Sequence, residues 1–169
     1  MRNRFPVTIS RAASTAAVTG NNNLGMGWRA GDELTSGYEN VMLGKDSSQQ
    51  NTVGYRNVTI GQGAAQCMQT GCNNVAIGYE ALMGSGTVSS NVGDSNVAIG
   101  NVAGRSLTSG CFNVFLGCAA GNGISSGSNN IFLGCHAGRS ATIAQNSIFI
   151  GRCTGGYCTV TGCYNLIGS

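Results

Sequence analysis

A glycine recurs at nearly constant spacing along the chain, and this period constrains the fold more than any other feature. Successive glycines are 17 residues apart, except for one interval of 22 between Gly78 and Gly100. The residue before each of them is always apolar. We call them the anchor glycines: Gly27, Gly44, Gly61, Gly78, Gly100, Gly117, Gly134, Gly151 and Gly168. A fixed period of this size predicts a repeat architecture, in which each repeat contacts its neighbours.

The residues around each anchor have the pattern of a short strand between tight turns. Apolar residues three and one positions before the anchor are two apart, so their side chains share one face of a strand. Glycine usually stands seven positions before the anchor and asparagine four before it, and both residue types tolerate the positive φ angles of turns. The asparagine row includes Asn40, Asn57, Asn74, Asn96, Asn113 and Asn130. The pattern predicts an all-β chain, a parallel β-solenoid of about nine 17-residue turns stacked about 4.8 Å apart.

Two further rows indicate how each turn is filled. The position three after the anchor is nearly always alanine, which predicts a place where two walls of the coil lie close together. The position eight before the anchor carries small or β-branched residues, such as Val53 and Ile143. We expect a second strand there, with these side chains facing a narrow interior.

The row two positions before the anchor is expected to point outward, because the rows on either side of it are more uniformly aliphatic. It becomes bulky towards the C-terminus, and an exposed apolar row calls for a partner surface. We therefore predict a homo-oligomer interface formed by this row, with Phe115, Phe132, Phe149 and Leu166 at its centre. The alternative is that this row forms the core and its neighbours face outward.

The repeat resembles that of a known family. Asn74–Ala81 (NVAIGYEA) and Asn96–Ala103 (NVAIGNVA) are similar to the head repeat of YadA-type trimeric autotransporter adhesins, and the longer 17-residue form resembles repeats of bacteriophage tail fibres. The resemblance covers roughly residues 20–169. It implies a left-handed parallel β-roll in a homotrimer that acts as a fibre or an adhesive head.

Composition and the absence of targeting segments limit the partners and the location that the sequence predicts. Charged residues make up 9% of the chain and the net charge is +3, which does not predict nucleic-acid binding. The opening MRNRFPVTIS lacks the apolar segment of a signal peptide, and no stretch approaches the roughly 20 apolar residues of a membrane span. We therefore expect a virion protein made in the host cytoplasm, with the bacterial cell surface as the alternative location. Its expected partners are itself, other virion proteins and a host surface glycan or protein.

The chain divides into residues 1–19, an N-terminal arm or cap, and residues 20–169, the repeat domain. The five extra residues of the long interval lie within Gly84–Asp94, and insertions in solenoids form loops that often carry function. The candidate contact residues in this loop are Ser85, Thr87, Val88, Asn91 and Asp94. A tolerated surface insertion is the alternative interpretation.

Eight cysteines are present, and two of them follow anchors in adjacent turns. Stacking would bring the Cα atoms of Cys118 and Cys135 to about 4.8 Å, within the range of a disulfide, so this is the candidate bridge. A zinc site is the more specific interpretation of the cysteines, but the usual zinc-site spacing of two residues between cysteines is absent. We therefore predict no metal or cofactor. Glu80 and Asp94 flank the insertion, and His136 follows Cys135, but neither pair makes a catalytic constellation. A non-enzymatic fibre protein is the function that the sequence favours.

Overall fold

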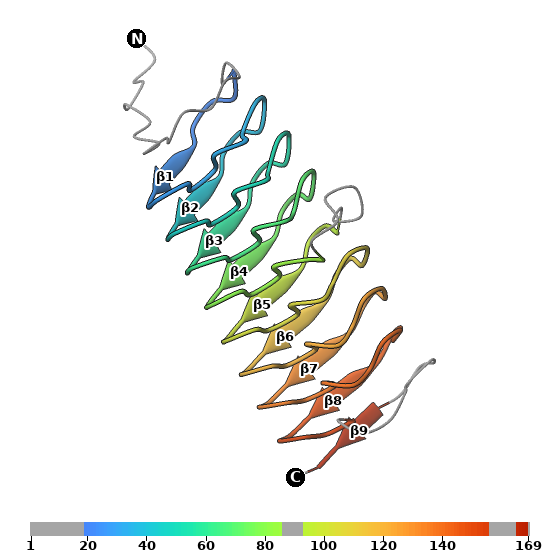
Figure 1. Ribbon diagram of the computed structural model, residues 1–169. Helices are drawn as coiled ribbons and strands as arrows, with labels where there is room; N and C mark the ends of the chain where they lie inside the picture. The colour runs from blue at the N-terminus through green and yellow to red at the C-terminus, as the bar shows by residue number, and fades with distance from the viewer. Residues whose placement is uncertain (1–18, 86–92, 156–164, 169) are drawn as a thin grey trace.

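The computed structural model describes residues 19–85, 93–155 and 165–168. These residues form nine parallel strands in one sheet, whose spatial order is the order along the chain. Figure 1 shows the strands stacked as rungs, with β1 and β9 at opposite ends of the stack and the loops projecting to one side. The strands are β1 (Leu24–Met26), β2 (Val41–Leu43), β3 (Val58–Ile60), β4 (Val75–Ile77), β5 (Val97–Ile99), β6 (Val114–Leu116), β7 (Ile131–Leu133), β8 (Ile148–Ile150) and β9 (Asn165–Ile167). The predicted parallel β-solenoid is confirmed.

The strands pair in the register that the sequence period demands. Val41 lies beside Val58 and Val58 beside Val75, and the pairing between β4 and β5 keeps the same register across the longer interval, with Val75 beside Val97. Eight steps of about 4.8 Å give a stack roughly 38 Å long. Within the described residues there is no helix long and apolar enough to cross a membrane.

Each anchor glycine ends its strand where the coil turns a corner. Gly117 has a φ of +134°, and a Cβ placed on it would lie 2.6 Å from the carbonyl oxygen of Gly134 in the next turn. Both the conformation and the close approach exclude a side chain. The glycine row therefore has the turn role that the sequence predicts.

The asparagines have a different role from the predicted one. They are buried, and from Asn23 to Asn113 each Oδ1 accepts hydrogen bonds from the backbone N–H and the side-chain amide of the next asparagine in the stack, a series that we call the asparagine ladder. Asn130 Oδ1 accepts from the backbone N of Ser147 instead. Asn57, for example, bonds Asn40 Oδ1 through its backbone N at 3.0 Å and through Nδ2 at 3.1 Å. Its Nδ2 also donates to the carbonyl oxygen of Gly71 at 2.8 Å. The residue before each asparagine takes the positive φ, as Glu39 (57°) and Arg56 (56°) do. Asparagine is needed here because its amide satisfies buried backbone groups, not because it turns the chain.

The core holds one side chain per strand, and it is the middle one. All seven side chains of this inner row, from β2 to β8, are fully buried: Met42, Thr59, Ala76, Ala98, Phe115, Phe132 and Phe149. The alanine row faces them, and Ala64, Ala81, Ala103 and Ala120 are likewise inaccessible to solvent. The prediction for the alanine row is confirmed, whereas the outward assignment of the middle row is wrong. The alternative, in which that row is the core, is correct.

The predicted second strand is not formed as a continuous element. Among the described residues, the row eight before the anchor makes only isolated bridges, from Ser109 to Ser126 and from Ser126 to Ile143. Val53 and Ile143 of this row are 44% and 46% exposed, so the row faces solvent rather than a narrow interior. The inner wall on this side comes from the row ten before the anchor, which includes Leu34, Met68, Leu107 and Ile124.

Candidate interaction surface

The outer face of the sheet is a continuous aliphatic surface. In β1 to β8 the first and third strand residues point away from the core, and every one of them is Val, Ile, Leu or Met. We call these side chains the aliphatic face: Leu24, Met26, Val41, Leu43, Val58, Ile60, Val75, Ile77, Val97, Ile99, Val114, Leu116, Ile131, Leu133, Ile148 and Ile150. Leu116 is 46% exposed and Met26 59%, and most of the others are half-buried. An ordered apolar surface of this kind is typical of an interface.

The apolar surface lies on different residues from those predicted from the sequence. Phe115, Phe132 and Phe149 have no solvent exposure within the single chain, because their rings fill the coil. They cannot touch a partner surface. The side chain of Leu166 in β9 lies outside the described residues, so its predicted role is not decided. The residues on either side of the phenylalanines are the ones available for packing.

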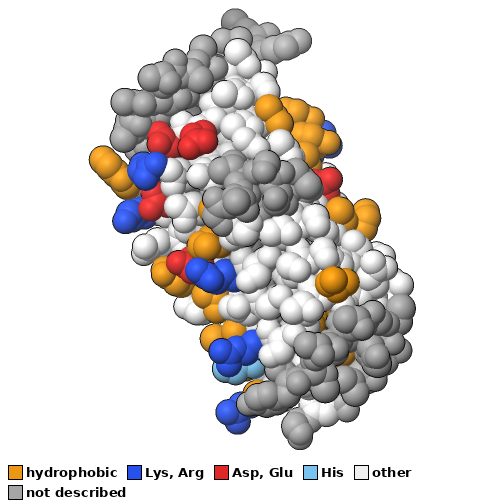
Figure 2. Space-filling view, turned by 45° about the vertical axis from the view of Figure 1, so that its right-hand side comes forward, with side chains coloured by type: hydrophobic (Ala, Val, Ile, Leu, Met, Phe, Trp, Pro, Cys, Tyr) orange, Lys and Arg blue, Asp and Glu red, His pale blue; other side chains and the backbone are white. Residues whose placement is uncertain are grey.

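Polar and charged side chains border the aliphatic face. The row one position after the anchor is mixed, with exposed Lys45 and Arg152 but also the exposed aromatic residues Trp28 and Tyr79. The next row carries ion pairs: Arg29 Nε lies 3.3 Å from Asp32 Oδ2, and Arg105 Nε lies 2.6 Å from Glu80 Oε2. In Figure 2 blue and red side chains follow one edge of the rod. We call this side of the aliphatic face, where the ion pairs gather, the polar border.

The ion pair of Glu80 joins two turns across the long interval. Burial opposes ionisation of this carboxyl, but hydrogen bonds from Tyr79 and Arg105, together with the charge of Arg105, outweigh it and hold the pKa of Glu80 below its usual value. Asp94 has another function, since its Oδ1 accepts a hydrogen bond from the backbone N of Cys72 at 2.7 Å. The two acids that flank the insertion thus serve separate structural contacts.

The candidate contact loop is only partly described. Ser85 and Asp94 are half-buried at its two ends. Thr87, Val88 and Asn91 lie outside the described residues, so their predicted contact with a ligand stays a prediction. The same holds for residues 1–18, and therefore for the predicted N-terminal arm or cap.

Cys118 and Cys135 lie in adjacent turns, as the repeat predicts. Both are exposed free thiols in the structure, so the candidate disulfide is not formed there. Their sulfur atoms and a ring nitrogen of His136 all lie within 4.8 Å of one another. Sequence reasoning did not expect His136 to join them, because adjacent strand residues point to opposite faces. His136 is not in a strand, and its φ of 60° turns the side chain back towards the cysteines.

Inside the coil, a small cavity is lined by Met68, Leu82 and Leu107 and by the side chains of Asn74 and Asn96. The side-chain amides of Asn74 and Asn96 already donate hydrogen bonds to the carbonyl oxygens of Gly93 and Gly110. The lining therefore offers packing surface rather than reactive groups. No family model, curated protein or solved structure matches this chain.

Proposed function

We propose that this protein is a non-enzymatic fibre protein that assembles as a homotrimer through its aliphatic face. The observation that carries the proposal is the uninterrupted run of aliphatic side chains along eight stacked strands, facing away from a core that is already complete. Hydrophobic side chains in such a row gain most when another ordered apolar surface covers them.

A second and a third copy of the same chain are the partners that fit this face best. Every strand presents the same two outward positions at the same spacing, so a neighbouring copy meets a matching periodic surface over the length of the stack. Symmetric assembly lets one patch serve all subunits. Three rods around a common axis would direct the three faces inward and leave the polar borders and loops outside. The similarity of the repeat to YadA-type heads and phage tail fibres points to the same number of subunits.

The biological setting that we propose is a phage particle, in which the trimer is a tail fibre, a spike or a decoration that contacts the host surface. The alternative is the head of a bacterial trimeric autotransporter adhesin. Immunogold electron microscopy with an antibody against this chain separates the two. Gold on phage particles supports the first; gold on intact bacterial cells that produce no particles supports the second.

The interface is tested by a matched pair of substitutions. Ile131 lies on the aliphatic face and is 38% exposed, whereas Ile143 is 46% exposed and lies outside the sheet. Ile131→Asp should dissociate the trimer in size-exclusion chromatography with light scattering, because three carboxylates would be buried near the axis. Ile143→Asp should leave the trimer intact. If both variants keep the mass of the unmodified protein, the aliphatic face is not the interface.

A further inference from the structure

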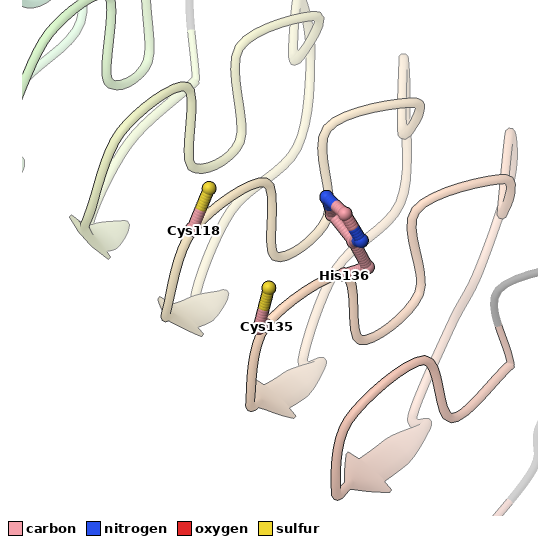
Figure 3. A group of neighbouring side chains, drawn as sticks. All are labelled: Cys118, Cys135 and His136. Carbon is pink, nitrogen blue, oxygen red and sulfur yellow. The ribbon is translucent and has the colours of Figure 1, made fainter.

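The corner that follows β6 and β7 gathers three side chains that prefer soft metal ions. Cys118 comes directly after the anchor of β6, and Cys135 and His136 directly after the anchor of β7. Figure 3 shows the two thiols on successive rungs and the imidazole beside them. One potential ligand atom from each residue lies within 4.8 Å of the other two.

The repeat itself fixes this geometry. The two cysteines occupy the same position in consecutive turns, so the sheet register stacks them. The backbone N of His136 donates to the carbonyl oxygen of Cys118 at 2.8 Å, which ties the second turn to the first at the cluster. The backbone of each of the three residues takes part in a hydrogen bond to an adjacent turn. The backbone of the cluster therefore has little conformational entropy left to lose when an ion binds.

The exposure of the two thiols distinguishes them from a structural cysteine. Cys67 is buried, and burial raises the pKa of its thiol, which keeps it protonated. Cys118 and Cys135 are exposed and His136 is half-buried, so an ion can reach all three from solvent. No carboxylate belongs to the cluster, which disfavours calcium and magnesium, since these ions need oxygen ligands.

We propose that Cys118, Cys135 and His136 bind one zinc ion per chain, with water as the fourth ligand. Zinc takes thiolate and imidazole ligands at about 2.3 Å and about 2.0–2.1 Å in tetrahedral geometry, which places ligand atoms roughly 3.5–3.8 Å apart. The sulfur and nitrogen atoms lie within 4.8 Å of one another, so side-chain rotations that move them by about 1 Å bring them to this range. Both thiols lose their protons on binding, and the released protons pass to solvent.

The zinc site would tie two adjacent turns together at the polar border of the aliphatic face. It makes no use of that face as an interface, so it stands whether or not the chain is a trimer. It would add a local clamp to a solenoid whose turns are otherwise held by backbone hydrogen bonds and a narrow core.

The test is metal binding by the full-length, reduced protein. Titration with Co²⁺ should give the charge-transfer and d–d absorption of a tetrahedral thiolate site, saturating at one ion per chain, and Zn²⁺ should displace it. Cys118→Ser, Cys135→Ser and His136→Ala should each weaken Zn²⁺ binding at least about tenfold in competition with a chromogenic chelator. Cys111→Ser, a half-buried thiol outside the cluster, should bind like the unmodified protein.

Cys158 and Cys163 lie outside the described residues, so a parallel series carries both as serine. Binding that persists in this background and disappears with Cys118→Ser supports the site. The proposal is overturned if reduced protein gives no thiolate–cobalt absorption, or if Cys118→Ser and Cys135→Ser bind zinc as tightly as Cys111→Ser.

Discussion

The coil is filled in two different ways along its length. Around β3 to β5 the inner residue is small (Thr59, Ala76, Ala98), and around β6 to β8 it is phenylalanine. The three rings lie in a row: Phe132 stacks on Phe149 with centroids 4.6 Å apart, and Phe115 is tilted by 45° against Phe132 with centroids 5.4 Å apart. The strands and the register are the same in both regions. The same backbone geometry therefore accommodates a core of small side chains in one region and a core of phenylalanine rings in the other.

The difference is compensated four residues after the anchor. The corner that matters lies in the turn before each inner residue. Before Thr59, Ala76 and Ala98 this position carries a side chain (Ser48, Ala65 and Leu82), and before Phe115, Phe132 and Phe149 it is glycine (Gly104, Gly121 and Gly138). The φ angle is positive in both regions, at 49° for Ala65 and 62° for Gly138. The corner thus has a left-handed residue throughout the described turns, and glycine stands where a large side chain, Met42 beside Gly31 or a phenylalanine ring beside Gly121 and Gly138, occupies the adjacent space. A large inner side chain therefore goes together with the absence of a side chain at the corner.

The largest effect is expected from emptying the aromatic region. Phe132→Ala removes a fully buried ring between two others and should destabilise the chain by about 3–5 kcal/mol. Thr59→Ala in the first region should cost about 1–3 kcal/mol, because Thr59 Oγ1 is a hydrogen-bond partner of buried Ser47 and Ser48 at 2.8 and 2.9 Å. Urea unfolding measures both. Equal costs would contradict the distinction between the two regions.

The asparagine ladder should be equally important in both regions. Asn57→Ala and Asn113→Ala each leave a buried glycine carbonyl and the groups of the next asparagine without their partner. We expect a loss of about 2–5 kcal/mol in each case, since one unsatisfied buried group costs about 1–3 kcal/mol. Chemical denaturation of the two variants makes the comparison. A much smaller loss in the aromatic region would mean that the rings, rather than the ladder, hold those turns together.

The dependence of the corner glycine on the neighbouring ring can be measured as a coupling free energy between Gly138 and Phe132. A Cβ on Gly138 would collide with the Phe132 ring, and all three of its nearest neighbours are atoms of that ring. Gly138→Ala alone should therefore cost about 1–3 kcal/mol by overpacking. On the Phe132→Ala background the same change should cost less, and the double-mutant cycle should give a coupling of about 1–2 kcal/mol. Strict additivity would show that the glycine is required for its conformation alone.

The smallest effect concerns the ion pair between Glu80 and Arg105, which joins the turns of β4 and β5 at the end of the first region. The folded-state pKa of Glu80 lies below its ordinary value of 4.5, so its contribution to stability is fully present above pH 4.5 and is lost as the pH falls through the lowered pKa. The pair is partly exposed, and we expect less than about 1 kcal/mol. Glu80→Gln should flatten the acid limb of the stability curve measured by urea unfolding at a series of pH values. An unchanged acid limb in Glu80→Gln would rule out this contribution.

The sequence predicts the architecture because the repeat averages over many turns. The positions of β2 to β8, their register and the buried alanine row all follow from the anchor spacing. The burial of Phe115, Phe132 and Phe149 does not follow, since alternation shows which residues share a face but not which face is inside. The uniformly aliphatic rows favour an inward assignment for themselves, but the coil is too narrow for more than one side chain per strand. The variable size of the inner row also indicates its position, because its small residues follow corners that carry a side chain and its phenylalanines follow corners with glycine.

The candidate sites were predictable to a lesser degree. The stacking of Cys118 on Cys135 follows from the repeat, but the approach of His136 depends on a left-handed φ at a residue that is not glycine. Such a φ is set by the closure of the whole coil rather than by local sequence. Asp94 and Glu80 flank the insertion in sequence, and only the structure shows that each is engaged by a different neighbouring turn.

The solution mass of the full-length chain, measured by light scattering after size exclusion, tests the central claim that the aliphatic face packs against copies of itself. A mass of three chains, independent of dilution over the micromolar range, is the expected result. A stable monomer would contradict it, because the aliphatic face would then remain exposed to water without a partner.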